Sequence, residues 1–283
     1  KYLQLRAARL CLQKAALPQE KVQLALAGDL QAQCTASSYA MRELGVPFAG
    51  LFGACSTMAE GLALGAALCE GGAARNLLAM ASSHFCAAER QFRTPLSYGA
   101  VRTPTAQWTA TAAGCCLLQP QGEGVGIAAA TFGRVQDYQV KDINNMGAAM
   151  APAAASTLLH YFKDTGTEPQ EFDCIYTGDL GQVGSQLLRE LLAAEGLLIK
   201  NHVDCGCILF DANEQSVKSG GSGPGCCAAV LCGHILPRLR RGSQKRVLFT
   251  ATGALMSQTT FLQKETIPAV AHLVELRAPE KEK

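Results

Sequence analysis

Charged and aromatic side chains are scarce in this 283-residue sequence, and none of its apolar runs is long. Charged residues make up 17% of it, aromatic residues 6%, and the net charge is only +2. Nucleic-acid-binding proteins carry a basic footprint, so we expect no nucleic-acid partner. No stretch reaches the ~18 uninterrupted apolar residues of a membrane-spanning helix. No secretory signal peptide is recognisable either.

Disulfide and metal-site spacings are also missing, although the sequence contains 13 cysteines. The number is odd and most cysteines lie inside apolar runs, where a free cysteine behaves as a small core residue. We therefore expect a reducing compartment. Cys205 and Cys207 flank a single glycine with no second pair nearby, which is unlike a zinc site. The sequence thus predicts no metal site.

Small and apolar residues are abundant in the sequence. Hydrophobic residues make up 48% of the chain and glycine occurs 28 times, which favours a globular protein with helices packed closely on sheets. The length is sufficient for a large core. The sequence begins at Lys1 inside an expected helix, so we expect that an N-terminal segment precedes it.

An internal repeat divides the chain. PQEKVQLALAGDL begins at Pro18, and PQEFDCIYTGDL begins at Pro169. Amphipathic patterns predict a helix before each copy (2–16 and 148–163) and another after each copy (33–44 and 182–195). One repeated motif can arise by chance, so a second is needed to establish duplication.

The second repeated unit is a glycine-rich turn, a helix of small residues and a buried strand. It begins at Gly53 and again at Gly220, and its strands are expected at 76–81 and 247–251. Further strands are expected at 113–119, 124–132, 206–211 and 268–276. Two units in the same order predict a duplicated α/β protein with halves 1–133 and 134–283. Ligands of such sheets bind beyond the carboxyl ends of the strands.

The turn Gly53-Ala54-Cys55-Ser56, which opens a helix, resembles the nucleophile turn of the thiolase superfamily, above all the third class of ketoacyl synthases. This resemblance implies the thiolase-like duplicated five-layer α/β/α/β/α fold, in agreement with the repeat.

Seven segments carry a more specific resemblance: LAGDL (26–30), FGACSTMAEGLALGAAL (52–68), SSHFCAAERQFR (82–93), KDINNMGAAMAPAAA (141–155), DCGCILFD (204–211), SGGSGPGC (219–226) and ATGALMS (251–257). Together they resemble the stage V sporulation protein AD family. This resemblance implies binding of dipicolinic acid (pyridine-2,6-dicarboxylate) for uptake into the developing bacterial spore, with calcium as the ligand's counter-ion and no other cofactor. It also implies a homodimer in the forespore cytoplasm, peripheral to the spore inner membrane, that works with other proteins of the stage V sporulation A membrane complex.

The alternative is a Cys-dependent acyltransferase or condensing enzyme. The positive end of a helix dipole favours a thiolate, which makes Cys55 a candidate nucleophile. The resemblance implies a partner histidine after the strand near Thr177 and an asparagine in the turn at 220–223. Asp179 follows Gly178 there, and the turn reads Gly-Gly-Ser-Gly. We therefore predict no catalytic residue, with His202 as the remaining weak partner, and keep a structural subunit as a third reading.

A planar dianion needs cationic groups, hydrogen-bond donors and an apolar slot. A segment after the strand 76–81 supplies two arginines and a histidine, and the glycine turn supplies backbone N–H groups at a helix start. The two aspartates either hold calcium with the ligand or bind donors that line the pocket. Trp108 is placed either at the pocket or at the dimer face. The predicted ligand-binding residues are Cys55, His84, Arg90, Arg93, Asp179, Asp204, Gly221, Ser222, Gly223 and Ser257.

Overall fold

The computed structural model describes residues 1–93, 101–211 and 214–280. The first half of the chain forms a four-stranded sheet of order β2-β1-β3-β5. Its strands are β1 (Leu24–Gly28), β2 (Phe48–Gly50), β3 (Leu77–Ser83) and β5 (Ala112–Leu118). β1 pairs in parallel with β2 and β3, and β5 runs antiparallel to β3.

The second half forms a five-stranded sheet of order β6-β11-β10-β7-β8. β10 pairs in parallel with β7, β7 pairs in parallel with β8, and β11 is antiparallel to both of its neighbours. Its strands are β6 (Gly126–Thr131), β7 (Cys174–Gly178), β8 (His202–Asp204), β10 (Arg246–Ala254) and β11 (Ala269–Arg277).

The two sheets repeat one topology, because β2-β1-β3-β5 and β8-β7-β10-β11 have the same order and the same directions. Each repeated Pro-Gln-Glu motif forms a 3-10 turn ahead of the matching strand, η1 (Gln19–Lys21) before β1 and η5 (Pro169–Glu171) before β7. β6 has no counterpart among the described strands of the first sheet. It precedes residue 133 but pairs with β11, so the chain passes from one sheet to the other within 119–125.

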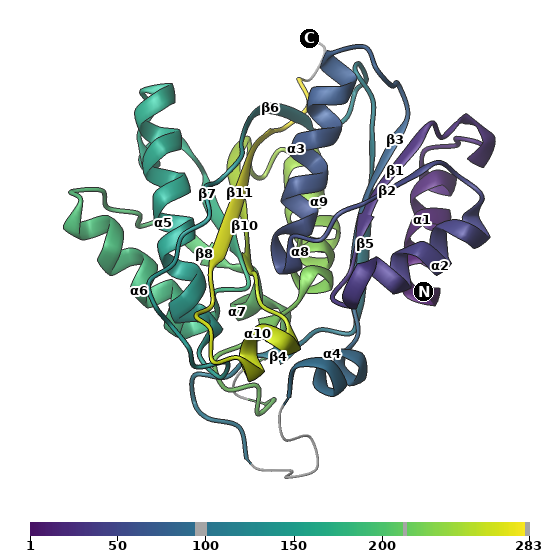
Figure 1. The fold of residues 1–283 in the computed structure, drawn as a ribbon. Helices are drawn as coiled ribbons and strands as arrows, with labels where there is room; N and C mark the ends of the chain where they lie inside the picture. Colours follow the sequence, from purple (N-terminus) through teal and green to yellow (C-terminus); the bar gives the residue numbers. More distant parts are fainter. Residues whose placement is uncertain (94–100, 212–213, 281–283) are drawn as a thin grey trace.

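Helices form three layers around the two sheets, which gives the predicted five-layer α/β/α/β/α arrangement (Figure 1). One outer layer is α1 (Tyr2–Lys14) and α2 (Thr35–Leu44), and the other is α5 (Met146–Thr165) and α6 (Gly181–Ala194). The middle layer holds α3 (Thr57–Glu70) and a continuous helical rod made of α8 (Pro224–Val230), the π-helical turn η6 (Leu231–Ile235) and α9 (Leu236–Arg240).

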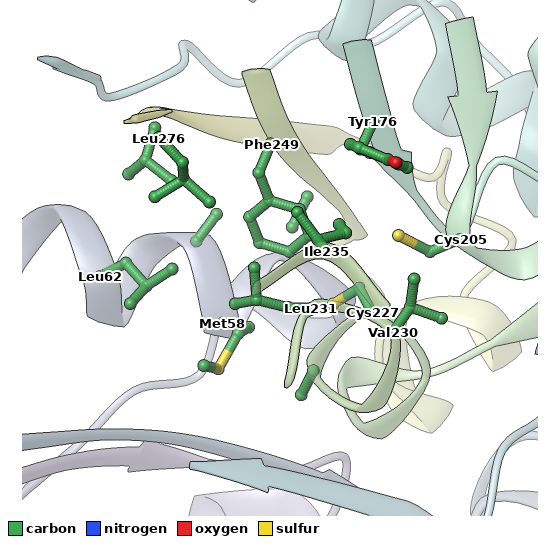
Figure 2. Packing of buried hydrophobic residues seen from close by; sticks show 14 of the residues in the cluster. Met58, Leu62, Tyr176, Cys205, Cys227, Val230, Leu231, Ile235, Phe249 and Leu276 are labelled. Atoms are coloured by element: carbon green, nitrogen blue, oxygen red, sulfur yellow. The ribbon is translucent and has the colours of Figure 1, made fainter. Parts of the chain in front are cut away.

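The middle layer is apolar on all sides because both of its faces are covered by sheets. Met58 and Leu62 of α3 lie against Leu231 and Ile235 of the rod, with Phe249 of β10 beside them (Figure 2). The contact between the layers is close at Gly114 of β5, where an added Cβ would lie 2.5 Å from the carbonyl oxygen of Ala228. Glycine and small helix residues therefore bring the first sheet directly onto the rod.

The predicted helices and most predicted strands are confirmed, but the strand expected at 206–211 is wrong. That segment is helix α7 (Cys205–Leu209), and its N-cap is Asp204, whose side chain accepts a hydrogen bond from the backbone N–H of Gly206. A short apolar run does not by itself distinguish a buried strand from a buried helical turn. Here the capping residue determines the outcome.

Candidate functional site

A cavity of about 590 Å³ opens where the carboxyl ends of the parallel strands of both sheets meet. The first half contributes Cys55 of the 3-10 turn η3 (Ala54–Ser56) and residues of α4 (Phe85–Phe92). The second half contributes Ser222 of the short strand β9 (Gly221–Ser222) and Ser257, the N-cap of α10 (Gln258–Leu262). Both halves are therefore needed to form this site.

Cys55 and Ser222 meet where the halves join, with 3.7 Å between Sγ and Oγ. Cys55 is only 8% exposed, and the preceding Ala54 has a left-handed φ of 51°. Burial, and then the nearby carboxyl of Asp179, raises the pKa of the Cys55 thiol well above its usual value. The thiolate expected from the helix dipole is thus wrong for this cysteine, because desolvation outweighs the dipole.

Asp179 lies behind Cys55 at the end of β7 and is completely buried. Its backbone is left-handed, with φ 68°, which is unusual for a residue other than glycine. Within the described parts of the chain neither carboxyl oxygen has a hydrogen-bond partner. Burial, and then the charge of Asp204, raises the pKa of Asp179 well above its usual value. Burial therefore disfavours the charged forms of both Asp179 and the neighbouring Cys55.

The two repeated aspartates, Asp29 and Asp179, have different structural roles. Asp29, in the first copy, accepts hydrogen bonds from the backbone N–H groups of Gln31 and Ser37, each at 2.8 Å, and so fixes the start of α2. In the second copy the corresponding turn is held by Asp204, which accepts from Leu180 N at 3.0 Å and Gly181 N at 2.9 Å. This leaves the Asp179 side chain free of a capping role.

Asp204 also accepts a hydrogen bond from Thr177 Oγ1 at 2.7 Å and from Gly206 N at 2.9 Å. Its oxygens are thus occupied by four donors, none of which lines the cavity, and neither Asp204 nor Asp179 lines it, so the predicted place of both aspartates in the ligand site is wrong. Its pKa is raised to about 6, with burial as the largest cause. Across residues 1–93, 101–211 and 214–280, no group of three or more His, Cys, Asp and Glu side chains has metal-binding geometry.

The basic part of the cavity is built around Arg102. Its guanidinium group lies over the Trp108 ring of β4 (Trp108–Thr109), 4.6 Å from the centroid, and donates from Nη1 to the carbonyl oxygen of Gln107 at 3.0 Å. Arg102 and Arg93 both pair with Glu89, the latter at 3.0 Å. Arg102 Nε is buried and has no partner among the described residues. Arg102 is itself a lining residue, so its positive charge lies at the cavity wall.

Gln107 connects the basic part to the Cys55 region. Its Nε2 donates to the carbonyl oxygens of Asp179 at 2.7 Å and Gly221 at 2.9 Å. Its buried Oε1 accepts from none of the described residues. Gln107 and Arg102 both line the cavity, but these two unpaired atoms are buried within its wall. Between these polar groups the wall is apolar, with contributions from Phe52, Phe92, Met146, Met150, Leu255 and Met256.

The structure brings four of the predicted residues to the cavity, namely Cys55, Arg93, Ser222 and Ser257. Arg90 does not line it. His84 lies instead in a separate cavity of about 230 Å³ beside Asp29, because it is the N-cap of α4 and its side chain leaves the strand on the other side. The prediction that Arg90 and His84 line the main pocket is therefore wrong.

The glycine turn supplies Ser222 but not a backbone anion site. Gly221 and Gly223 lie behind Ser222 and do not line the cavity. The N-terminus of α8 faces Ser83 of β3, whose hydroxyl accepts from Gly225 N at 3.1 Å. The predicted anion site at this helix start is thus wrong, because a buried serine already occupies it.

Arg102 and Gln107 were not predicted from sequence, since they lie in a segment without periodic hydrophobicity. The only signal was the neighbouring Trp108, which the structure places under Arg102 and stacked on Phe85, with 4.9 Å between ring centroids. The histidines are placed away from Cys55. His160 contacts Ser156 O, His202 contacts Thr177, His234 contacts Arg238, and His272 contacts Gly133 N.

The described helices include none with both the length and the apolar character that a bilayer crossing requires.

Comparison with solved structures defines the class of fold as that of thiolase-like condensing enzymes. A cerulenin-bound OleA from Xanthomonas campestris superposes with a TM-score of 0.64 and 15% identity, covering 97% of this chain and 79% of that one. The 3-oxoacyl-[acyl-carrier-protein] synthase III from Aquifex aeolicus VF5 gives 0.61 and 14% identity, with 97% and 83% covered. At these identities the likeness establishes the fold alone.

The sequence comparison is more specific. Residues 1–277 match the family described as Stage V sporulation protein AD. Stage V sporulation protein AD of Bacillus subtilis (strain 168) is 43% identical over 267 residues, which cover 94% of this chain and 79% of that protein. The chain belongs to the Stage V sporulation protein AD family, as the sequence resemblance implied.

Proposed function

We propose that this chain binds dipicolinic acid in the cavity between its halves, without converting it, for uptake into the developing spore. The observation that carries the proposal is the Arg102 guanidinium group in the cavity lining, where it is held over the Trp108 ring. A guanidinium group forms strong charge-assisted hydrogen bonds with a carboxylate, so a carboxylate ligand suits this wall of the cavity. The proposed ligand class comes from the family resemblance, and this geometry supports it.

The rest of the cavity suits a flat dianion. Two arginines face one glutamate, which leaves an excess of positive charge, and Phe52 and Phe92 supply apolar surface for a ring. The cavity volume of about 590 Å³ falls within the ~300–1,000 Å³ typical of small-molecule sites. In this arrangement one carboxylate pairs with Arg102 and the other accepts from the Ser222 hydroxyl.

The proposal of binding without turnover rests on the surroundings of Cys55. Condensing chemistry requires a thiolate and donors that stabilise an oxyanion. Burial holds Cys55 in its thiol form, and the adjacent residue is the acid Asp179 rather than a histidine. We infer that the thiol fills the end of the cavity next to Ser222 and has no nucleophilic role.

The remaining parts of the proposal rest on family membership. Calcium enters as the counter-ion of the ligand, and the chain supplies no other cofactor. The protein acts as a homodimer in the forespore cytoplasm, peripheral to the spore inner membrane, together with other proteins of the stage V sporulation A membrane complex. The competing proposal is a purely structural subunit of that complex, which would be retained by its membrane partners without binding a small molecule.

Isothermal titration of the purified protein with dipicolinate, with and without calcium, tests the proposal. We expect saturable binding of dipicolinate and none of benzoate, because a single carboxylate cannot engage both ends of the cavity. Flat titrations on protein shown to be folded by circular dichroism would support the structural subunit instead. A mass increase on Cys55 after incubation with an acyl-coenzyme A would show that the cysteine is a nucleophile and would contradict binding without turnover.

A further inference from the structure

A pair of cysteines lies where the two halves meet, at the contact between β5 and the middle-layer rod. Cys116 of β5 and Cys232 of the π-helical turn η6 have their sulfur atoms 3.9 Å apart. Both residues are half-buried. Neither residue lines either of the two cavities described above. The pair is therefore separate from the ligand site.

The backbones that carry these cysteines are held close together by the Gly114 contact. Gly114 approaches the backbone of Ala228 so closely that an added Cβ would clash with its carbonyl group. Cys116 lies two residues beyond Gly114 and hence on the same face of β5, ~7 Å further along. Cys232 lies four residues beyond Ala228, one helical turn or ~6 Å further along. Strand β5 and the rod thus cover similar distances from the Gly114–Ala228 contact, which brings Cys116 next to Cys232.

The surroundings of the pair favour reaction at Cys232. The pKa of its thiol is lowered, chiefly because Cys116 can donate a hydrogen bond to its sulfur, and Arg240 adds a favourable charge. On the opposite face of β5, Cys115 is turned toward Cys11 of α1 in the outer core. The strand therefore places its two adjacent cysteines in different layers, and only Cys116 faces the second half.

We propose that Cys116 and Cys232 form a reversible disulfide that covalently links the two halves of the protein. The Cys232 thiolate attacks a hydroperoxide, its sulfur is oxidised to a sulfenic acid, and hydroxide or alkoxide leaves. The Cys116 sulfur then attacks the sulfenic sulfur, which releases water and forms the S–S bond. A dithiol reductant reverses the reaction. Closing the gap from 3.9 Å to the ~2.05 Å of a disulfide requires small side-chain rotations.

The test uses hydrogen peroxide on the folded protein in a Cys86→Ala background, because Cys86 is exposed and would form links between molecules. Peptide mapping without reduction is expected to find the Cys116–Cys232 link, with the loss of two hydrogens from the intact mass. Cys232→Ser should abolish this link, whereas Cys207→Ser, a half-buried cysteine elsewhere, should leave it intact.

A second measurement follows the consequence of the link. The oxidised protein should unfold at a higher urea concentration than the reduced one, and dithiothreitol should reverse the shift, because the bond closes a long loop in the unfolded chain. If Cys116 and Cys232 both remain free thiols after hydrogen peroxide has fully oxidised other cysteines, the proposal is overturned. A link confined to Cys11 and Cys115 would overturn it as well.

Discussion

Replacing Arg102 by alanine is expected to weaken dipicolinate binding by about 10- to 100-fold in isothermal titration. Hydrogen bonds to charged groups contribute ~1.5–3 kcal/mol, and each 1.4 kcal/mol corresponds to about a tenfold change in affinity. The loss has two sources. The ligand carboxylate loses the Arg102 guanidinium group, and Glu89 loses one of its two arginines and so repels the ligand more strongly.

Arg90→Ala is the control, since Arg90 is an arginine of the neighbouring helix α4 that does not line the cavity. We expect its affinity to equal that of the unchanged protein. Arg102→Lys should give an intermediate affinity, because lysine keeps the charge but loses the planar stacking on Trp108. Equal weakening by Arg90→Ala and Arg102→Ala would mean that only overall charge matters, and the assigned carboxylate contact would then be incorrect.

The second large effect is expected from Asp204→Ala, which should lower the free energy of unfolding by about 2–4 kcal/mol. The substitution leaves three backbone N–H groups and the Thr177 hydroxyl without their acceptor in a buried turn, and such orphaned groups cost ~1–3 kcal/mol each before relaxation. Urea denaturation at neutral pH measures the loss. Asp142→Ala serves as the control, because Asp142 is exposed and accepts from one surface N–H. Similar losses in both variants would refute the structural role of Asp204.

Asp179→Asn should have the opposite sign and stabilise the protein at pH 7 by about 1–3 kcal/mol, since it removes a buried carboxyl whose ionised form is disfavoured by burial and by Asp204. Because the folded-state pKa is raised, Asp179 favours folding below its unfolded pKa of ~3.9, and this contribution is lost as pH rises through the folded pKa. The variant should therefore lose less stability with rising pH. The decline that remains between about pH 4 and about pH 6 belongs to Asp204. An unchanged pH profile in Asp179→Asn would show that the acid is already ionised.

The repeat predicted much of the fold because it preserves the spacing of strands and turns. It located Asp29 and Asp179 at matching positions, and it identified Cys55 and Ser222 as residues of facing turns. Sequence similarity could not show that Asp204 takes over the capping work in the second half, because that role depends on a contact between segments 23 to 27 residues apart. The expected roles of the repeated aspartates therefore diverged from the observed ones.

The basic part of the site was only partly predictable. Arg93 was found because it follows a strand of the sheet, but the same argument wrongly included Arg90 and His84. Side-chain direction at a strand-to-helix junction depends on which residue caps the helix, and a pattern of hydrophobicity does not encode this. Arg102 and Gln107 are defined by stacking on Trp108 and by hydrogen bonds to carbonyl groups of the second half. Such contacts exist only in the folded protein.

The middle layer, finally, has the character of a subunit interface that has been enclosed within one polypeptide. Two copies of an ancestral α/β unit packed through α3 and its counterpart would form a symmetric dimer, in which every residue has to serve both positions at once. Covalent fusion removed that constraint. Asp29 could keep its place at the start of a helix while Asp179, at the matching position of the second half, became an isolated acid behind Cys55. An asymmetric pocket could thus arise on a symmetric scaffold.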